Sequence, residues 1–114
     1  MTSKGKLQLR LLAGAALAAV ALSGSLNAEG KSASDIYLDK CSVCHGADGA
    51  GKTAKGKKLK VKDVREQVIK LTAEQMAEVV TKGKDPDMDA FGKEFKPEQV
   101  RELVAYYREL AKKK

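Results

Sequence analysis

The stretch CSVCHG, residues 41–46, decides how the rest of the chain is interpreted. Two cysteines stand two residues apart, and the single histidine of the chain, His45, follows the second cysteine directly. A structural zinc site usually has four ligands in two spaced pairs, and this chain has no other cysteine or histidine besides Cys41, Cys44 and His45. A thioredoxin-like dithiol would sit in a βαβ setting, and a plain disulfide would leave His45 without a role.

The same spacing, C-x-x-C-H, is the attachment signature of a c-type haem. Two thiols so placed add across the two vinyl groups of the porphyrin, and the residue that follows is held beneath the iron. We therefore expect one haem c, attached covalently through Cys41 and Cys44, with His45 as an axial ligand. A zinc site completed by a carboxylate and a Cys41–Cys44 disulfide remain the alternatives.

The first 28 residues have the pattern of a secretory signal peptide. Three basic residues, Lys4, Lys6 and Arg10, precede the uncharged stretch LLAGAALAAVAL, residues 11–22, and SGSLNA ends at Ala28. This apolar stretch is shorter than the about 20 residues of a membrane-spanning helix. We expect cleavage after Ala28, export to the periplasm, one domain over residues 29–114 and no stable membrane insertion.

The periodicity of residues 29–114 predicts an all-α domain. Ser34 is expected to cap a short helix over residues 35–41 that runs into the cysteine motif. A second helix is expected over residues 71–83, because Thr72 and Gln75 form a capping box. Pro97 fits the first position of a closing helix.

The connections between these helices are expected to be loops. Residues 46–58 contain four glycines and no large apolar side chain, and residues 84–95 are also rich in turn residues. No segment has a strand pattern with a partner. The chain has no Trp, two Phe and three Tyr, so a large apolar group at the centre would supply an interior that the side chains alone cannot.

The sixth iron ligand is expected to be Met88. Haem iron in an electron carrier usually has two protein ligands, and His45 is the one histidine. Of the three methionines, Met1 leaves with the signal peptide and Met76 lies on the apolar face of the second helix. Met88 lies in a polar loop between two aspartates. Met76, or an open or water-bound iron, remains as an alternative.

With these motifs the chain resembles a small class I cytochrome c of the single-domain periplasmic kind, over about residues 32–111. YLDKCSVCHGADG and MDAFGKEF are the functional parts, and LTAEQMAEVVTKGK and PEQVRELVAYYREL are the matching helices. The resemblance implies a cytochrome c-like fold with three main helices and long loops wrapped around one covalently bound haem. It further implies that Tyr106 packs against the helix bearing Tyr37, and that Leu103 and Tyr107 lie toward the haem.

The chain departs from its relatives at two prolines. Relatives usually have proline after the ligand methionine, where this chain has Asp89. They also often have a proline after the haem motif, whose carbonyl accepts a hydrogen bond from the proximal histidine, but residues 46–85 contain none. Because that bond fixes the imidazole ring, some other backbone carbonyl in residues 46–62 is expected to accept from His45 Nδ1–H.

These expectations define a monohaem electron carrier that moves one electron at a time between periplasmic or membrane redox partners and is not an enzyme. Six of the eleven residues 52–62 are lysine, and further lysines flank the methionine loop, namely Lys82, Lys84, Lys93 and Lys96. Such a rim steers acidic redox partners, although charge runs are commonly just solvated surface. We expect a monomer that binds no nucleic acid. The alternative functions are a c-haem enzyme or sensor with an open distal site, and a haem-free domain held by a disulfide.

Overall fold

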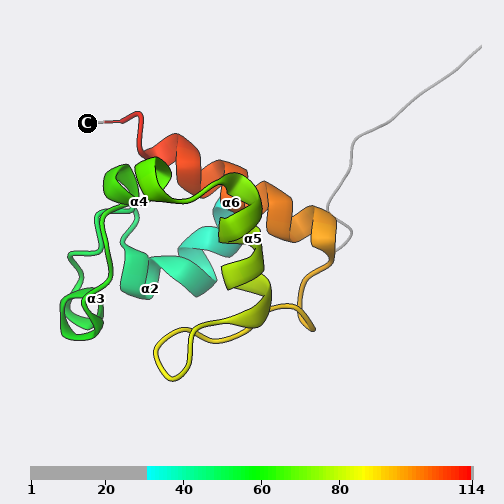
Figure 1. The fold of residues 1–114 in the computed structure, drawn as a ribbon, viewed down its shortest axis with the longest axis horizontal. Coiled ribbons are helices and arrows are strands. Elements are labelled where there is room, and N and C mark those ends of the chain that lie inside the picture. The colour runs from blue at the N-terminus through cyan, green and yellow to red at the C-terminus, as the bar shows by residue number, and fades with distance from the viewer. Residues whose placement is uncertain (1–30, 114) are drawn as a thin grey trace, which may run out of the picture. The chain divides into compact units, whose positions relative to one another are not determined.

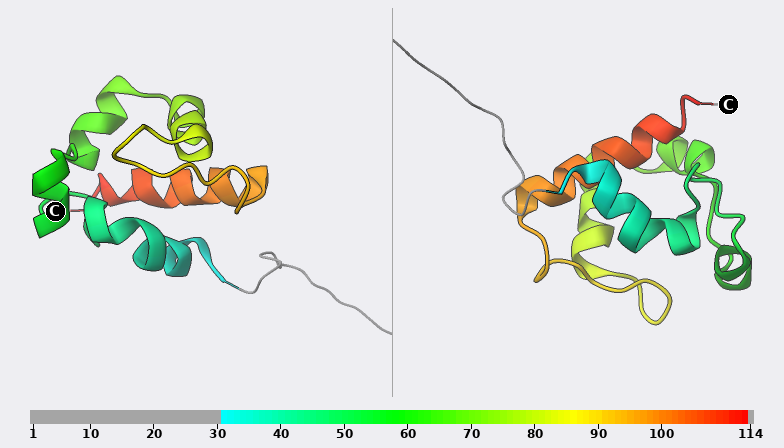
Figure 2. Two further views of the ribbon diagram at one scale, coloured as in Figure 1. Left: turned by 90° about the horizontal axis from the view of Figure 1, so that it is seen from below. Right: turned by 180° about the vertical axis from the view of Figure 1, so that it is seen from behind.

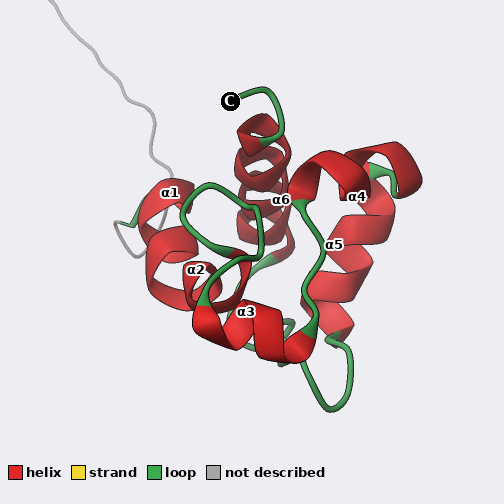
Figure 3. Ribbon diagram, turned by 90° about the vertical axis from the view of Figure 1, so that its left-hand side faces the viewer, coloured by secondary structure: helices red, strands yellow, loops and turns green. Residues whose placement is uncertain are grey.

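The computed structural model describes residues 31–113, so the expected signal peptide over residues 1–28 lies outside the described part. These described residues form one compact unit. Its elements, in chain order, are α1 (Ala33–Ile36), the π-helical segment η1 (Tyr37–Cys41), α2 (Ser42–His45), α3 (Ala54–Leu59), α4 (Val64–Lys70), α5 (Ala73–Lys82) and α6 (Pro97–Leu110). The described residues contain no strand (Figure 3), so the expected all-α class is confirmed.

The segments α1, η1 and α2 follow one another without a break and together form the N-terminal helix, residues 33–45. The N-cap is Ser32, whose Oγ accepts a hydrogen bond from the Asp35 N–H at 3.1 Å. The prediction of Ser34 as the cap was wrong, because Ser34 already lies inside the first turn, where its hydroxyl contacts that of Ser32. The helix then carries Cys41 and His45 to its carboxyl end.

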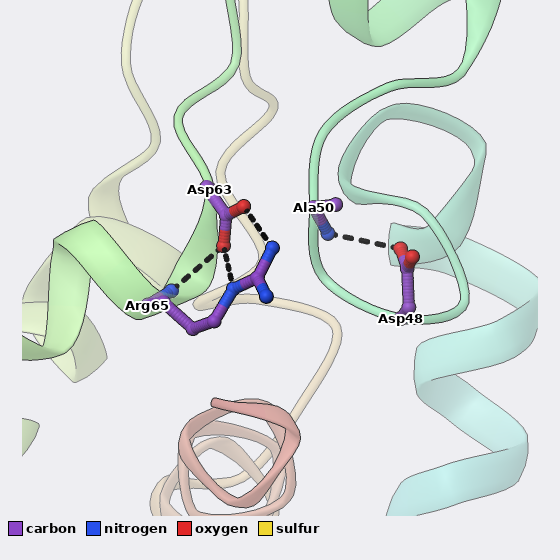
Figure 4. Close-up of polar contacts among 4 residues, drawn as sticks. All are labelled: Asp48, Ala50, Asp63 and Arg65. Atoms are coloured by element: carbon purple, nitrogen blue, oxygen red, sulfur yellow. Dashed lines mark hydrogen bonds and ion pairs between the residues drawn. The ribbon is translucent and has the colours of Figure 1, made fainter. Parts of the chain in front are cut away.

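Two short helices form where the sequence predicted irregular structure. The expectation of a loop throughout residues 46–58 was wrong, because Thr53 caps α3 by accepting from the Gly56 N–H at 2.9 Å. Gly56 is buried against the Cys44 carbonyl, so only a residue without a side chain fits there. Asp63 in turn caps α4 by accepting from the Arg65 N–H at 2.9 Å (Figure 4).

The turn before α3 and the start of α4 are both held by aspartate side chains (Figure 4). Asp48 accepts from the Ala50 N–H at 3.0 Å. Asp63 forms a salt bridge with the Arg65 guanidinium at 2.6 Å, and the hydrogen bonds from Arg65 lower the pKa of the Asp63 carboxyl to about 2. The carboxylate therefore stays ionised, which favours the amino end of a helix.

The two longer predicted helices are confirmed. In α5 the Thr72 Oγ1 accepts from the Gln75 N–H at 3.1 Å, and the Gln75 side chain accepts from the Thr72 N–H at 2.8 Å, which completes the capping box. Pro97 occupies the first turn of α6. Both helices bury one apolar face, as their periodicity predicted.

Helix α6 lies at the centre of this unit, between the N-terminal helix on one side and α4 and α5 on the other (Figures 1 and 2). The core is built on its buried face, with Leu103 and Leu110 packed against Ile36, Tyr37 and Val64, and Val100 and Val104 packed against Met76. No helix in the described part of the chain has the length and apolar character needed to cross a membrane.

Candidate haem site

An apolar cavity of about 680 Å³, open solvent included, lies between the N-terminal helix, α4, α5 and α6. The loop after α5 also contributes to its wall. Figure 3 shows α2 on one side, α5 on the other and α6 behind them. Most of the wall consists of aliphatic, aromatic and thioether side chains, namely Leu71, Met76, Val79, Val80, Phe91, Phe95, Leu103, Val104 and Tyr107.

A second, more polar compartment of about 1410 Å³, open solvent included, adjoins the apolar one. The two share five wall residues, which are Cys41, His45, Gln67, Met88 and Phe91. The outer compartment also has Cys44 in its wall, together with five lysines, Lys40, Lys55, Lys60, Lys62 and Lys84. An apolar interior therefore opens through a lysine-lined mouth.

The structure brings the predicted site residues to this common space from two distant segments. Cys41 and His45 come from the N-terminal helix and Met88 from the loop after α5, and all three line both compartments, whereas Cys44 lines the outer one alone. Both cysteines are free thiols, and burial, with a smaller contribution from Cys44, raises the pKa of the Cys41 thiol to about 11. The motif thus places Cys41 where the two compartments meet and Cys44 in the outer compartment alone.

The π-helical segment precedes the motif and ends on Cys41. Its hydrogen bond runs from the Ser42 N–H to the Tyr37 carbonyl, five residues back. Single π-helical turns within α-helices are common at functional sites, because the extra residue re-aims the side chains that follow. The sequence carries no signal that would have predicted it.

The segment after the motif satisfies the carbonyl groups at the end of α2. The Thr53 hydroxyl donates to the Val43 carbonyl at 2.7 Å, and the Gly51 N–H donates to the His45 carbonyl at 2.8 Å. The Tyr37 hydroxyl donates to the Gly46 carbonyl at 2.7 Å. The carboxyl end of the motif is therefore held from three directions, which fixes the backbone that carries the imidazole.

His45 nevertheless lacks the hydrogen bond that was expected of it. Its Nδ1 atom is buried and has no partner, so the prediction that a backbone carbonyl in residues 46–62 accepts from it was wrong. The nearby carbonyls already serve other donors, as shown for Gly46 and His45 itself. Burial lowers the pKa of the His45 imidazole, which favours the neutral form that binds metals.

A second buried polar atom without a partner lies beside His45. The Tyr107 ring meets the His45 ring edge to face, with centroids 5.2 Å apart, and the Tyr107 hydroxyl has no hydrogen-bond partner. Burial, with a smaller contribution from Asp63, raises the pKa of Tyr107 to about 12. The neighbouring Tyr106 instead packs on Tyr37 at 5.2 Å, as the resemblance implied.

The loop that carries Met88 is held firmly against α5. The Lys84 and Met88 backbones exchange two hydrogen bonds of 2.8 Å, and the Phe91 N–H donates to the Val80 carbonyl at 2.9 Å. Gly83 adopts a positive φ of 75°, and a side chain there would collide with the Met88 carbonyl. Met88 is half-buried, whereas Met76 is buried among the core residues of α5 and α6.

Two parts of the site were missed by sequence reasoning. Gln67 on α4 lines both compartments, and α4 itself was not predicted, although Asp63 before VREQVIK is an available capping signal. Phe91 and Phe95 also line the apolar cavity and stack on each other at 5.7 Å. Both side chains belong to the segment MDAFGKEF, but no role in the site was predicted for them.

The residues present fit a haem by three observations. Two cysteines at the attachment spacing line the adjoining compartments, Cys41 both of them and Cys44 the outer one alone. An imidazole whose pKa is lowered by burial lines both compartments, and two buried polar atoms, His45 Nδ1 and the Tyr107 hydroxyl, lack partners. Unpartnered buried polar atoms are rare in a complete structure. Cys41, Cys44 and His45 are the residues that would hold the group, and Met88 is placed in the same wall.

Comparisons with known proteins agree with this site. The fold and motif are those of an all-α c-type cytochrome. A family model described as cytochrome c oxidase, cbb3-type, subunit III, matches residues 28–106, and the chain belongs to this family of c-type cytochrome domains. Membership implies covalently bound haem c and haem-based electron transfer. No curated protein matches the chain.

Two solved structures are also similar to the chain. One is described as KustC0563 c-type cytochrome, with a TM-score of 0.65 and 29% identity, and the match covers 70% of this chain and 98% of that one. The other is a mutant of Kustc0563, with a TM-score of 0.64 and 28% identity, covering 70% of this chain and 99% of that one. Both support the cytochrome c-like fold.

Proposed function

We propose that the protein is a monohaem c-type cytochrome that carries single electrons between periplasmic or membrane redox partners. In this proposal Cys41 and Cys44 would attach the haem through thioether bonds, and His45 and Met88 would bind its iron. The observation that carries the proposal is the shared wall. Cys41, His45 and Met88, from two distant segments, line the same pair of adjoining compartments.

Haem c, when bound, supplies one iron that gains or loses a single electron. The side chains of this chain set the conditions for that exchange. His45 offers a neutral imidazole nitrogen, and Met88 offers a soft thioether sulfur, a ligand that raises the reduction potential. The apolar wall disfavours additional charge and excludes water, which acts in the same direction. The backbone bonds around both residues limit movement between the two oxidation states.

A substitution at Met88 tests the ligand assignment against the alternative of an open distal site. The Met88→Leu variant keeps the side-chain volume but removes the sulfur. We expect it to lose the methionine–iron charge-transfer band of the ferric protein, to bind added imidazole, and to have a lower reduction potential. Visible spectroscopy of the purified haem protein measures the first two effects.

Met76→Leu is the matched control, because Met76 lines the inner compartment alone. This variant is expected to retain the charge-transfer band. If Met88→Leu retained the band and Met76→Leu lost it, the ligand would be Met76. If the unmodified protein lacked the band and bound imidazole readily, an enzyme or sensor with an open distal site would replace the carrier.

Export and attachment form the second part of the proposal. We propose that residues 1–28 direct the chain to the periplasm and are removed there, a location in keeping with a c-type cytochrome. The mass of the protein recovered from the periplasm of a host with c-type maturation should equal residues 29–114 plus one haem. A Cys41→Ala, Cys44→Ala double variant that still carried covalent haem would contradict the attachment.

We also propose that partners dock at the lysine-lined mouth. Of the lysines predicted to form the rim, Lys55, Lys60, Lys62 and Lys84 line the outer compartment, and Lys40 joins them from the N-terminal helix. Lys82 instead pairs with Glu78 at 2.8 Å. A positive rim around an exposed redox group speeds the encounter with an acidic partner and keeps the complex short-lived.

A further inference from the structure

The imidazole of His45 is the starting point, because its hydrogen-bond requirement is not met. A histidine that binds a metal almost always donates its second ring N–H to a carboxylate, a carbonyl or a water, and this bond fixes the ring and increases its basicity. In this structure Nδ1 of His45 is buried without a partner. The acceptor must therefore be sought among the groups that face the ring.

Three backbone carbonyls near the motif already accept hydrogen bonds from other donors. The His45 carbonyl accepts from the Gly51 N–H at 2.8 Å and the Gly49 carbonyl from the Val64 N–H at 2.8 Å. The Gly46 carbonyl accepts from both the Gly49 N–H at 3.0 Å and the Tyr37 hydroxyl at 2.7 Å. These bonds hold the carbonyls in directions set by the fold of residues 46–51, and none of them accepts from Nδ1.

The Tyr107 hydroxyl is the complementary group. It is buried, it has no partner, and its ring is packed against the His45 ring with centroids 5.2 Å apart. The two atoms without partners therefore belong to two rings in direct contact. A phenylalanine would fill the same space without burying a hydroxyl, and burying an unpaired hydroxyl is unfavourable.

We propose that Tyr107 is the positioning residue of the proximal histidine: its hydroxyl oxygen accepts the hydrogen bond from His45 Nδ1–H. The resemblance implied that a backbone carbonyl after the motif accepts this hydrogen bond. In this chain we assign that role to a side chain on α6. The inference rests on the proposed function, since it needs His45 Nε2 to face the iron. It also links the haem ligand to the central helix of the fold.

The consequence is electronic as well as structural. An imidazole that donates from Nδ1 is a stronger base at Nε2, and a more basic axial ligand favours the ferric state. The Tyr107 hydroxyl therefore lowers the reduction potential relative to a protein with phenylalanine at this position. It works against Met88 and the apolar wall, which raise the potential.

The test compares Tyr107→Phe with Tyr106→Phe in the full haem-loaded protein. Both variants remove one hydroxyl from the same helix, but Tyr106 packs on Tyr37 and does not line the cavity. We expect Tyr107→Phe to raise the midpoint potential and to speed solvent exchange of the His45 Nδ1–H, followed by proton NMR. We expect Tyr106→Phe to change neither value.

Unchanged potential and exchange in Tyr107→Phe would overturn the assignment, and so would equal shifts in both variants. A measurement on the unmodified protein is independent of variant folding. Nuclear Overhauser contacts from the His45 Nδ1–H to the Tyr107 ring protons support the proposal, whereas contacts to residues 46–62 alone refute it. A protein without haem would instead refute the proposed function, so the two failures are distinguishable.

Discussion

Two tyrosines illustrate how the same side chain serves different ends at the residue scale. Tyr37 and Tyr107 are both packed in the core around α6, and burial raises the pKa of each. The Tyr37 hydroxyl donates to the Gly46 carbonyl at 2.7 Å, so it holds the backbone directly after the haem motif. The Tyr107 hydroxyl has no such partner, and its ring packs against the imidazole. Tyr37 therefore has a structural role, whereas we propose that Tyr107 positions the histidine that binds the iron.

The hydrogen bond of Tyr37 leads to a prediction about stability. Tyr37→Phe is expected to lower the free energy of unfolding of the haem protein by about 1 kcal/mol, because a buried hydrogen bond is lost while the ring packing remains. Chemical denaturation measures the change. Tyr106→Phe is the control, since its hydroxyl is not among the groups that hold the motif. An equal loss in both variants would contradict the role given to the Tyr37 bond.

At the scale of elements, local capping signals predicted helices better than glycine content excluded them. Thr72 with Gln75 marked α5 correctly, and Pro97 marked α6. The glycines of residues 46–58 were interpreted as a loop, yet α3 forms there because Gly56 permits close contact with the Cys44 carbonyl. That contact joins two segments that are not neighbours in the sequence, so no local sequence pattern predicts it.

The start of the N-terminal helix gives a prediction at this scale. Ser32→Ala is expected to destabilise the protein by about 1 kcal/mol, since it removes the side chain that caps the Asp35 N–H. Ser34→Ala is expected to have little effect, because alanine is a good helix former inside the first turn. Thermal or chemical denaturation of both variants measures the difference. A larger loss of stability in Ser34→Ala than in Ser32→Ala would indicate that Ser34 is the N-cap.

The distribution of charge belongs to the whole molecule. Lysines from the N-terminal helix, from α3 and its following turn, and from the methionine loop meet at the mouth of the outer compartment. The segments are far apart in sequence, so the run in residues 52–62 revealed only part of the rim. Three aspartates of the methionine loop, Asp85, Asp87 and Asp89, also line this compartment, which makes the surface uneven in charge.

A charge reversal at the mouth tests whether this surface matters. Lys62→Glu is expected to slow electron transfer with an acidic redox protein roughly threefold or more at low ionic strength, and the difference should fade as salt screens the charges. Stopped-flow rates over a series of salt concentrations measure this. Lys113→Glu carries the same change in net charge outside the compartment wall. Equal slowing by both variants would indicate net charge rather than a docking site.

The sequence by itself determined the chemistry of the motif, the all-α class and the two longer helices. Each of these depends on residues close together in the chain: C-x-x-C-H, a capping box, a proline at a helix start and an apolar face repeated every turn. The tertiary structure alone decided α3 and α4 as parts of the wall, the place of Gln67 in it, and the ring contact between His45 and Tyr107. Those features depend on which distant segments pack together. The packing decides which side chains become buried, and a sequence pattern within one segment does not contain that information.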